Sequence, residues 1–127
     1  MNDDLLYKEA ILELNRHPLN KKLLTDFDVE AREFNPLCGD DMTVRIKFDK
    51  DGRVAKVGWE GVGCAISTAA VSLVTEEVKG KSKTEILLMN LKDVTDLLGI
   101  EIIPTRVQCV LLGLKAVQRA ISECYEP

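Results

Sequence analysis

The sequence predicts a single α+β domain in which a small antiparallel sheet is covered on one side by helices. Residues 42–48 alternate apolar and polar side chains, a pattern typical of a half-buried strand. Residues 64–78 repeat apolar side chains at steps of three and four, which is typical of a helix that packs on a sheet. The 127 residues contain no internal repeat and no linker, so residues 1–127 are expected to form one domain.

Three strands are expected, and two of them form a hairpin. Residues 29–34 are expected to lie at an edge of the sheet. Residues 42–48 and 53–60 flank Asp49–Gly52, where Gly52 can take the positive φ that a hairpin turn needs. The core-facing side chains of this hairpin are expected to be Val44, Ile46, Phe48, Ala55, Val57 and Trp59.

Two helices flank these strands in the sequence. Leu5–Arg16 carries its apolar residues on one stripe and ends before Pro18, which cannot continue a helix. Gly61 and Gly63 are expected to end the last strand. The helix that follows them is expected to end at Gly80, because glycine readily takes the left-handed conformation found after helix ends.

The last third of the chain is predicted to be helical. Ser82 and Glu85 have the spacing of a capping box, in which each side chain binds a backbone N–H of the other. Residues 92–98 form a short helix that stops at Gly99, and residues 104–124 form a long C-terminal helix.

Composition and charge argue against several classes of partner. The chain has 17 Lys and Arg residues against 21 Asp and Glu, a net charge of −4 and no basic run, so we expect no nucleic-acid partner. No apolar stretch reaches the roughly 20 residues that span a bilayer, so we expect no membrane partner. The N-terminus is acidic and lacks a signal-peptide pattern. We therefore expect a cytoplasmic protein whose four cysteines are free, metal-bound or reactive rather than disulfide-linked.

Three of the four cysteines lie at a turn or near the start of a helix, namely Cys38, Cys64 and Cys109. The partial positive charge of a helix N-terminus lowers a thiol pKa, and thiolates are soft ligands for zinc, Cu(I) or iron–sulfur iron. Cys124 instead continues the apolar stripe of the last helix and is expected to be a core thiol. Because no Cys-x-x-Cys pair is present, the spacing leaves a shared three-thiol site and separate buried thiols as open alternatives.

Other polar residues beside these cysteines could complete a site. Asp40 is a candidate ligand, the alternative being a solvated turn aspartate. Gln108 could bind weakly through its amide oxygen, but a helix-surface position is the favoured interpretation. Gly39 and Gly63 allow the backbone to approach a bound group closely. His17 is the only histidine and is expected on the surface, which leaves no Ser–His or Cys–His catalytic pair.

Short motifs surround the three cysteines. They are Asn35-Pro36-Leu37-Cys38-Gly39-Asp40, Gly63-Cys64-Ala65-Ile66-Ser67 and Arg106-Val107-Gln108-Cys109. In this order they resemble the motifs of the U-type iron–sulfur cluster assembly scaffolds, which are IscU, SufU and the N-terminal domain of NifU. The similarity runs from about Leu6 to Ile121. The resemblance implies a three-stranded α+β fold with a long C-terminal helix and a mobile N-terminal segment, here residues 1–27.

The resemblance also implies a function. Members of this family receive sulfur from a cysteine desulfurase and iron from an iron donor, build a [2Fe–2S] cluster and transfer it to apo iron–sulfur proteins. By motif position, Cys38, Cys64 and Cys109 would be cluster ligands and sulfur acceptors, and Cys109 would attack the desulfurase persulfide. Asp40 would admit iron and keep the cluster labile, because a carboxylate is a poorer iron ligand than a thiolate. Such a protein is a scaffold or carrier rather than an enzyme.

Two features depart from the IscU pattern. Gln108 stands where IscU usually has a histidine, which leaves Asp40, a partner's thiol or a small molecule as the fourth ligand. Residues 102–106 lack one proline of the stretch that a dedicated Hsp70 chaperone recognises in IscU, so the resemblance does not carry over chaperone binding. The residues expected to support the ligands from nearby are Gly39, Gly63, Arg106 and Gln108.

Two other functions fit the same residues. One is a zinc-bound sulfur acceptor for a cysteine desulfurase, with the metal held tetrahedrally by Cys38, Asp40, Cys64 and Cys109. The other is a structural zinc module that only binds protein partners. The zinc-binding SufU branch has an insertion between its second and third cysteines. The short path from Cys64 to Cys109 has no room for that insertion, which favours the scaffold.

Serine substitutions test the ligand set. Replacing Cys38, Cys64 or Cys109 by serine is expected to abolish stable cluster binding, because a hydroxyl is a much poorer ligand for iron than a thiolate. Cys124→Ser is the matched control and is expected to leave binding intact. The measurement is the visible absorption of anaerobically reconstituted protein, and equal loss in Cys124→Ser would show that the ligand set is wrong.

Overall fold

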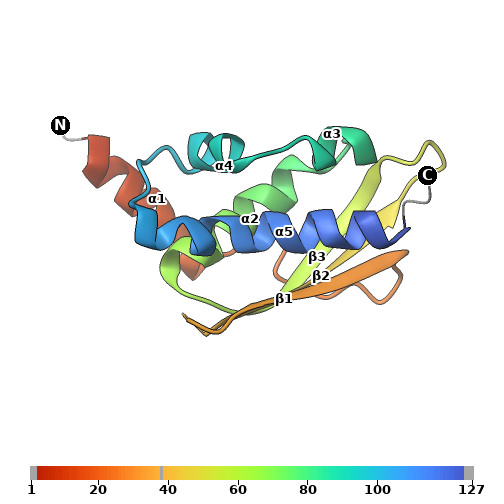
Figure 1. Cartoon of the computed structure of the whole chain (residues 1–127), viewed down its shortest axis with the longest axis horizontal. Coiled ribbons are helices and arrows are strands. Elements are labelled where there is room, and N and C mark those ends of the chain that lie inside the picture. The colour runs from red at the N-terminus through yellow and green to blue at the C-terminus, as the bar shows by residue number, and fades with distance from the viewer. Residues whose placement is uncertain (1–2, 38, 125–127) are drawn as a thin grey trace.

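The computed structural model describes residues 3–37 and 39–124, and it has the predicted α+β architecture (Figure 1). Its elements are α1 (Asp3–Arg16), β1 (Val29–Asn35), β2 (Asp40–Phe48), β3 (Val54–Val62), α2 (Ala65–Glu77), α3 (Lys83–Leu87), α4 (Leu91–Leu98), the 3₁₀ turn η1 (Pro104–Arg106) and α5 (Val107–Cys124). As predicted, α5 is the longest of the described helices. None of the helices in the described ranges is both long enough and apolar enough to cross a membrane.

The three strands pair antiparallel in sequence order, with β2 in the centre. The inward-facing side chains of β2, Met42, Val44 and Ile46, are fully buried because α5 packs across the sheet. Figure 1 shows α2 and α5 as a layer between the sheet and the short helices α3 and α4. At one end of the sheet the register places Asn35 of β1 opposite Asp40 of β2. The first cysteine motif therefore spans the β1–β2 connection.

The predicted inward face of β3 is wrong at its first position. Ala55 is exposed, whereas Val54 is buried. The register between β2 and β3 shifts beside Phe48, which pairs with Val54. Because side chains alternate along a strand, an irregularity of one residue exchanges the inward and outward positions next to it. Val57 and Trp59 are buried as predicted, and Gly58 between them is buried too because the backbone of Lys22 lies against it.

The prediction that Gly61 ends the strand is also wrong, because β3 continues to Val62. Gly61 has a φ of +145°, and it pairs with Met42 across the sheet. A Cβ atom at this position would collide with the backbone carbonyl of Asp41. The glycine thus lets β3 stay paired with β2 up to the residues that lead into α2.

The N-terminal part of the chain contacts the domain at several points. In α1, Ile11 is buried, and the Asn15 side-chain amide donates to the carbonyl of Ala65 over 3.1 Å. The connector after α1 passes the edge of β3, where Trp59 Nε1 donates to the carbonyl of Leu19 over 2.8 Å. That residues 1–27 move relative to the rest of the domain stays a prediction.

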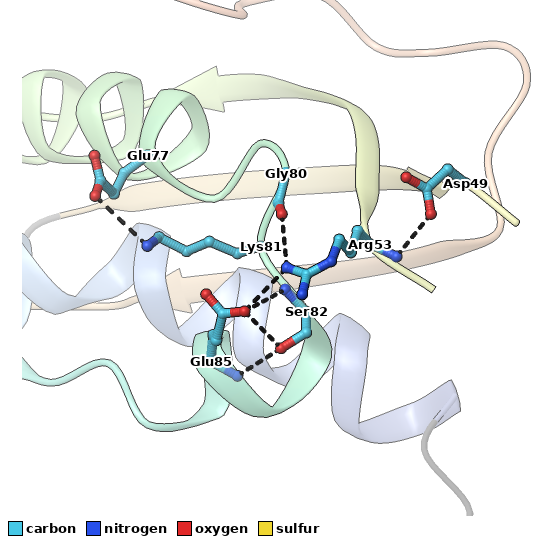
Figure 2. Close-up of polar contacts among 7 residues, drawn as sticks. All are labelled: Asp49, Arg53, Glu77, Gly80, Lys81, Ser82 and Glu85. Carbon is cyan, nitrogen blue, oxygen red and sulfur yellow. Dashed lines mark hydrogen bonds and ion pairs between the residues drawn. The ribbon is translucent and has the colours of Figure 1, made fainter. Parts of the chain in front are cut away.

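The β2–β3 hairpin is tied to the start of α3 (Figure 2). Arg53 Nη1 donates to the carbonyl of Gly80 and to Glu85 Oε1, each over 3.0 Å. Ser82 and Glu85 form the predicted capping box, in which Ser82 Oγ accepts from the Glu85 N–H over 3.2 Å. Asp49 Oδ1 accepts from the Arg53 N–H over 3.0 Å and so closes the hairpin turn at its other end. These bonds fix the loop that follows α2.

The helices α2 and α5 approach each other closely at Gly113. A Cβ atom on Gly113 would lie 2.8 Å from Cβ and 2.9 Å from Cα of Val71. Since both helices are buried there, neither can move aside without disturbing the core. The two helices that begin beside Cys64 and Cys109 are therefore held together by a glycine contact.

Gly113→Ala is expected to lower the free energy of unfolding by about 1–3 kcal/mol, because the added methyl group overpacks the contact with Val71. The destabilisation by overpacking should exceed the stabilisation of about 1 kcal/mol that alanine has over glycine in a helix interior. Ser122→Ala, at an exposed position of the same helix, is the control and should not destabilise the protein. Denaturant unfolding measures both, and a stabilised Gly113→Ala variant would contradict the packing argument.

Candidate metal centre

Three segments bring possible metal ligands together at one end of the sheet. Asp40 begins β2, Cys64 precedes the first residue of α2, and Cys109 lies in the first turn of α5. One carboxylate oxygen and the two sulfur atoms all lie within 4.8 Å of one another. The predicted ligand Cys38 and the side chain of Cys124 lie outside the described residues. The fold thus assembles one site from the described members of the predicted ligand set.

Asp40 is fully buried, and only one of its oxygen atoms is hydrogen-bonded. Oδ1 accepts from the backbone N–H of Cys64 over 2.9 Å. Oδ2 is also buried and has no hydrogen-bond partner among the residues that the structure describes. A buried carboxylate oxygen without a partner is unfavourable unless it neutralises a positive charge. The residues present therefore fit a cation at this point.

Cys64 is half-buried and caps the N-terminus of α2. Its sulfur accepts from the backbone N–H of Ser67 over 3.5 Å and lies 3.4 Å from the Ser67 hydroxyl. Burial raises the pKa of the Cys64 thiol, and the charge of Asp40 also raises it. Hydrogen bonds from the Ser67 hydroxyl, the Ser67 N–H and the Cys109 thiol lower it by more. The net effect holds the pKa of Cys64 below the ordinary cysteine value, so more thiolate is available at neutral pH.

Cys109 is fully buried, unlike Cys64. Val110, the next residue on α5, is also fully buried, and the Cys109 sulfur lies within 4.8 Å of the Cys64 sulfur and of an Asp40 carboxylate oxygen. A reagent or partner protein therefore reaches Cys64 more easily than Cys109.

The glycines of the motifs have identifiable roles. A Cβ atom on Gly63 would press on the Ser67 hydroxyl and lie 2.8 Å from Met42 Cε and 3.2 Å from Asp40 Oδ1, so a larger residue here would displace the side chains around the carboxylate. Gly39 has a φ of +72°, and its N–H donates over 2.8 Å to the carbonyl of Asn35. Gly39 thus supplies the left-handed conformation that turns the chain into β2.

The other predicted neighbours lie on the surface. Gln108 is exposed, and its Oε1 accepts from Lys115 Nζ over 3.0 Å, which agrees with the helix-surface interpretation. Arg106 is exposed and lines a groove of about 400 Å³ beside Cys64, together with Ile66, Ile100, Glu101, Ile102 and Ile103. His17 is exposed, as predicted.

The role of Ser67 was not predicted, although Ser67 is part of the motif around Cys64. The signal was the spacing of three residues between Cys64 and Ser67. The third residue of a helix presents its free backbone N–H to the capping side chain, here a sulfur atom.

Ser67→Ala is expected to raise the pKa of Cys64, because it removes the hydroxyl that stabilises the thiolate. In the unsubstituted protein, the alkylation rate of Cys64 should reach half its maximum at a lower pH than the alkylation rate of an ordinary thiol does. In Ser67→Ala the pH of this midpoint should be higher. Iodoacetamide labelling at a series of pH values, resolved by peptide mass spectrometry, measures it. Thr68→Ala is the control, since the Thr68 hydroxyl contacts the carbonyl of Gly63 instead of a sulfur atom. An unchanged midpoint in Ser67→Ala would contradict the assignment.

Comparisons with known proteins agree with this geometry. A family model described as the NifU-like N terminal domain matches residues 6–126. The chain is 32% identical to the zinc-dependent sulfurtransferase SufU of Bacillus subtilis, over 96% of this chain and 93% of SufU. It is 31% identical to the iron–sulfur cluster assembly scaffold protein IscU of Thermotoga maritima, over 97% of each chain.

The fold has a match among solved structures as well. The crystal structure of the N-terminal part of a nitrogen-fixing NifU-like protein from Brucella abortus superposes with a TM-score of 0.73 at 24% identity, over 92% of each chain. Sequence motifs, fold and family match lead to the same conclusion. The chain belongs to the family of the NifU-like N-terminal domain, the U-type scaffold proteins that include IscU and SufU.

Proposed function

We propose that this protein is a scaffold that assembles a [2Fe–2S] cluster from iron and desulfurase-derived sulfur and passes it to apo-proteins. The observation that carries the proposal is the approach of Asp40, Cys64 and Cys109 to within 4.8 Å of one another, with one carboxylate oxygen buried and unpaired. Cys38 is the proposed third thiolate. The predicted cytoplasmic location belongs to the same proposal, because free thiols persist in a reducing compartment.

Sulfur transfer begins with a thiolate attack in this proposal. The Cys64 thiolate attacks the outer sulfur of the desulfurase persulfide, the S–S bond breaks, and the desulfurase cysteine leaves as a thiolate. The sulfane sulfur then remains on Cys64 as a persulfide, and an external electron donor supplies the two electrons that convert it to sulfide as the cluster forms. The burial of Cys109 and the lowered pKa of the more exposed Cys64 favour Cys64 as the first acceptor, in place of Cys109.

Asp40 has two functions in this proposal. Its Oδ1 holds the N-terminus of α2 through the Cys64 N–H, which keeps the Cys64 sulfur in place. Its Oδ2 binds incoming iron. Because a carboxylate holds iron less tightly than a thiolate does, Asp40 is the ligand that is displaced first when the cluster leaves. The protein thus acts as a carrier rather than as a catalyst.

The proposed partners are a cysteine desulfurase, an iron donor and apo iron–sulfur proteins. Leu37 and Val62 are large apolar side chains with 90% and 67% exposure. Leu37 lies in the connection between β1 and β2, and Val62 pairs with Asp41, the residue after Asp40. An exposed apolar surface of this kind supports protein docking at the centre.

A zinc-bound sulfur acceptor is the second candidate function. It is favoured by the 32% identity to a relative named as a zinc-dependent sulfurtransferase, and three thiolates with one carboxylate form a suitable tetrahedral zinc site. In that case the metal stays on the protein, and the thiolate that accepts sulfur is also a zinc ligand.

Anaerobic reconstitution with iron, cysteine and a cysteine desulfurase separates these functions. A visible cluster spectrum with acid-labile sulfide supports the scaffold. Stimulation of the desulfurase by zinc-loaded protein, without formation of a cluster, supports the zinc-bound acceptor. Loss of folding on chelation, with neither activity, would leave only a structural zinc module.

Asp40→Ala is expected to slow release of the assembled cluster to an apo-protein or a chelator, because the ligand that exchanges most easily is gone. Asp40→Asn should also slow release while keeping an oxygen to accept from the Cys64 N–H, so it controls for disturbance of the α2 N-terminus. Stopped-flow absorbance follows the transfer. Faster loss of the cluster in both variants would contradict the role of Asp40.

A further inference from the structure

Asn35 lies at the end of β1, directly opposite Asp40 in the antiparallel register. Residues opposite each other in a sheet place their side chains on the same face, here the face covered by helices. Asn35 has only 8% exposure, and Asp40 has none. A carboxamide therefore lies beside the carboxylate of the metal centre and is almost completely removed from solvent.

Only half of the Asn35 carboxamide is hydrogen-bonded. Its Oδ1 accepts from the backbone N–H of Leu37 over 3.1 Å, which orients the side chain along the loop toward β2. Its Nδ2 is buried and has no hydrogen-bond partner within residues 3–37 and 39–124. Buried amide donors are nearly always satisfied, so an unpaired donor beside a binding site indicates a missing acceptor.

The donor of Asn35 and the acceptor of Asp40 are unpaired at the same time. Asn35 Nδ2 and Asp40 Oδ2 come from opposite residues, yet they do not bond to each other. The free acceptor suits a cation, and the free donor suits an anion. A metal–thiolate centre supplies both in one place, since its positive metal ions are surrounded by negatively charged sulfur atoms.

We propose that Asn35 is a positioning residue of the centre, whose Nδ2–H group donates a hydrogen bond to an anionic sulfur atom bound there. This inference rests on the proposed metal-binding function. The sulfur is either a ligating thiolate or a sulfide of the assembled cluster. A hydrogen bond to a thiolate stabilises its deprotonated form, so protons compete less with the metal and metal binding is stronger. A hydrogen bond to any sulfur of the cluster withdraws negative charge from the centre and so favours the reduced state.

Asn35→Ser and Asn35→Ala distinguish hydrogen bonding to the centre from the structural role of Asn35 in the turn, where it accepts from the Leu37 N–H. Serine can still accept from the Leu37 N–H, but its shorter side chain withdraws the donor from the centre, whereas alanine loses both functions. Asn90→Ser is the matched control, because Asn90 caps α4 through its side-chain oxygen and serine caps a helix equally well.

Three measurements are made on the full chain: the zinc affinity by competition with a chromophoric chelator, the reduction potential of the reconstituted cluster, and the unfolding of metal-free protein. Asn35→Ser and Asn35→Ala are expected to lower the zinc affinity about tenfold. Both should also lower the reduction potential. Metal-free Asn35→Ser should unfold like the unsubstituted protein, since the buried donor has no partner without a metal centre.

The outcomes identify the acceptor. A fall in both zinc affinity and potential assigns the hydrogen bond to a thiolate, and a fall in potential alone assigns it to a sulfide. Unchanged values in Asn35→Ser, or changes in Asn35→Ala alone, would overturn the inference by reducing Asn35 to a turn residue. If the unsubstituted protein bound neither zinc nor a cluster, the proposed function would fail and this inference with it.

Discussion

The hydrogen bond between the Cys64 N–H and the Asp40 carboxylate is the contact on which the centre depends. It joins the start of the central strand to the start of α2, two segments that the β2–β3 hairpin separates in the sequence. Because Asp40 is fully buried, water cannot replace this bond. The absence of a side chain on Gly63 leaves the space through which the two groups approach. The relative positions of Asp40 and Cys64 are thus set by contacts within the protein chain itself.

The same arrangement makes the metal-free centre electrostatically unfavourable. Asp40 raises the pKa of Cys64, while the hydrogen bonds of Ser67 and Cys109 lower it. Two groups that tend to carry negative charge are therefore held together in a site with little access to water. In the proposed function a bound cation relieves this repulsion, which favours metal binding although one of the proposed ligands is a carboxylate. A site of this kind favours taking up metal without preventing its later release.

Much of the fold could be predicted from local patterns, and the errors have physical causes. The alternation in β2, the capping box at Ser82 and the stop at Gly99 each depend on neighbouring residues, and all three were correct. Ala55 and Gly61 were misplaced because their positions depend on the register with β2, which their own neighbours do not determine. Pairing across the sheet is set by the whole hairpin, so local periodicity cannot reveal it.

The site was predicted unevenly for a similar reason. Thiols and a carboxylate in recognisable motifs suggested candidate ligands, but spacing alone could not show that Asp40, Cys64 and Cys109 would meet. Ser67 and Asn35 were not assigned a role, because serine and asparagine are common at turns and helix starts, where they usually bind only the backbone. Their positions beside Cys64 and Asp40 become visible only when the strands and helices are assembled.

The glycine contact between α2 and α5 has a mechanical consequence. Val71 lies seven residues beyond Cys64, and Gly113 lies four residues beyond Cys109. Each cysteine is therefore joined to the Gly113–Val71 contact by a short helical segment, which acts as a lever arm. At 1.5 Å per residue these arms are about 10 Å and about 6 Å long. A change of about 10° in the crossing angle would therefore move the Cys64 end by roughly 2 Å, which is comparable to a metal–sulfur bond length. Because this contact is buried and closely packed, it resists such a change and so holds the spacing of the two sulfur atoms.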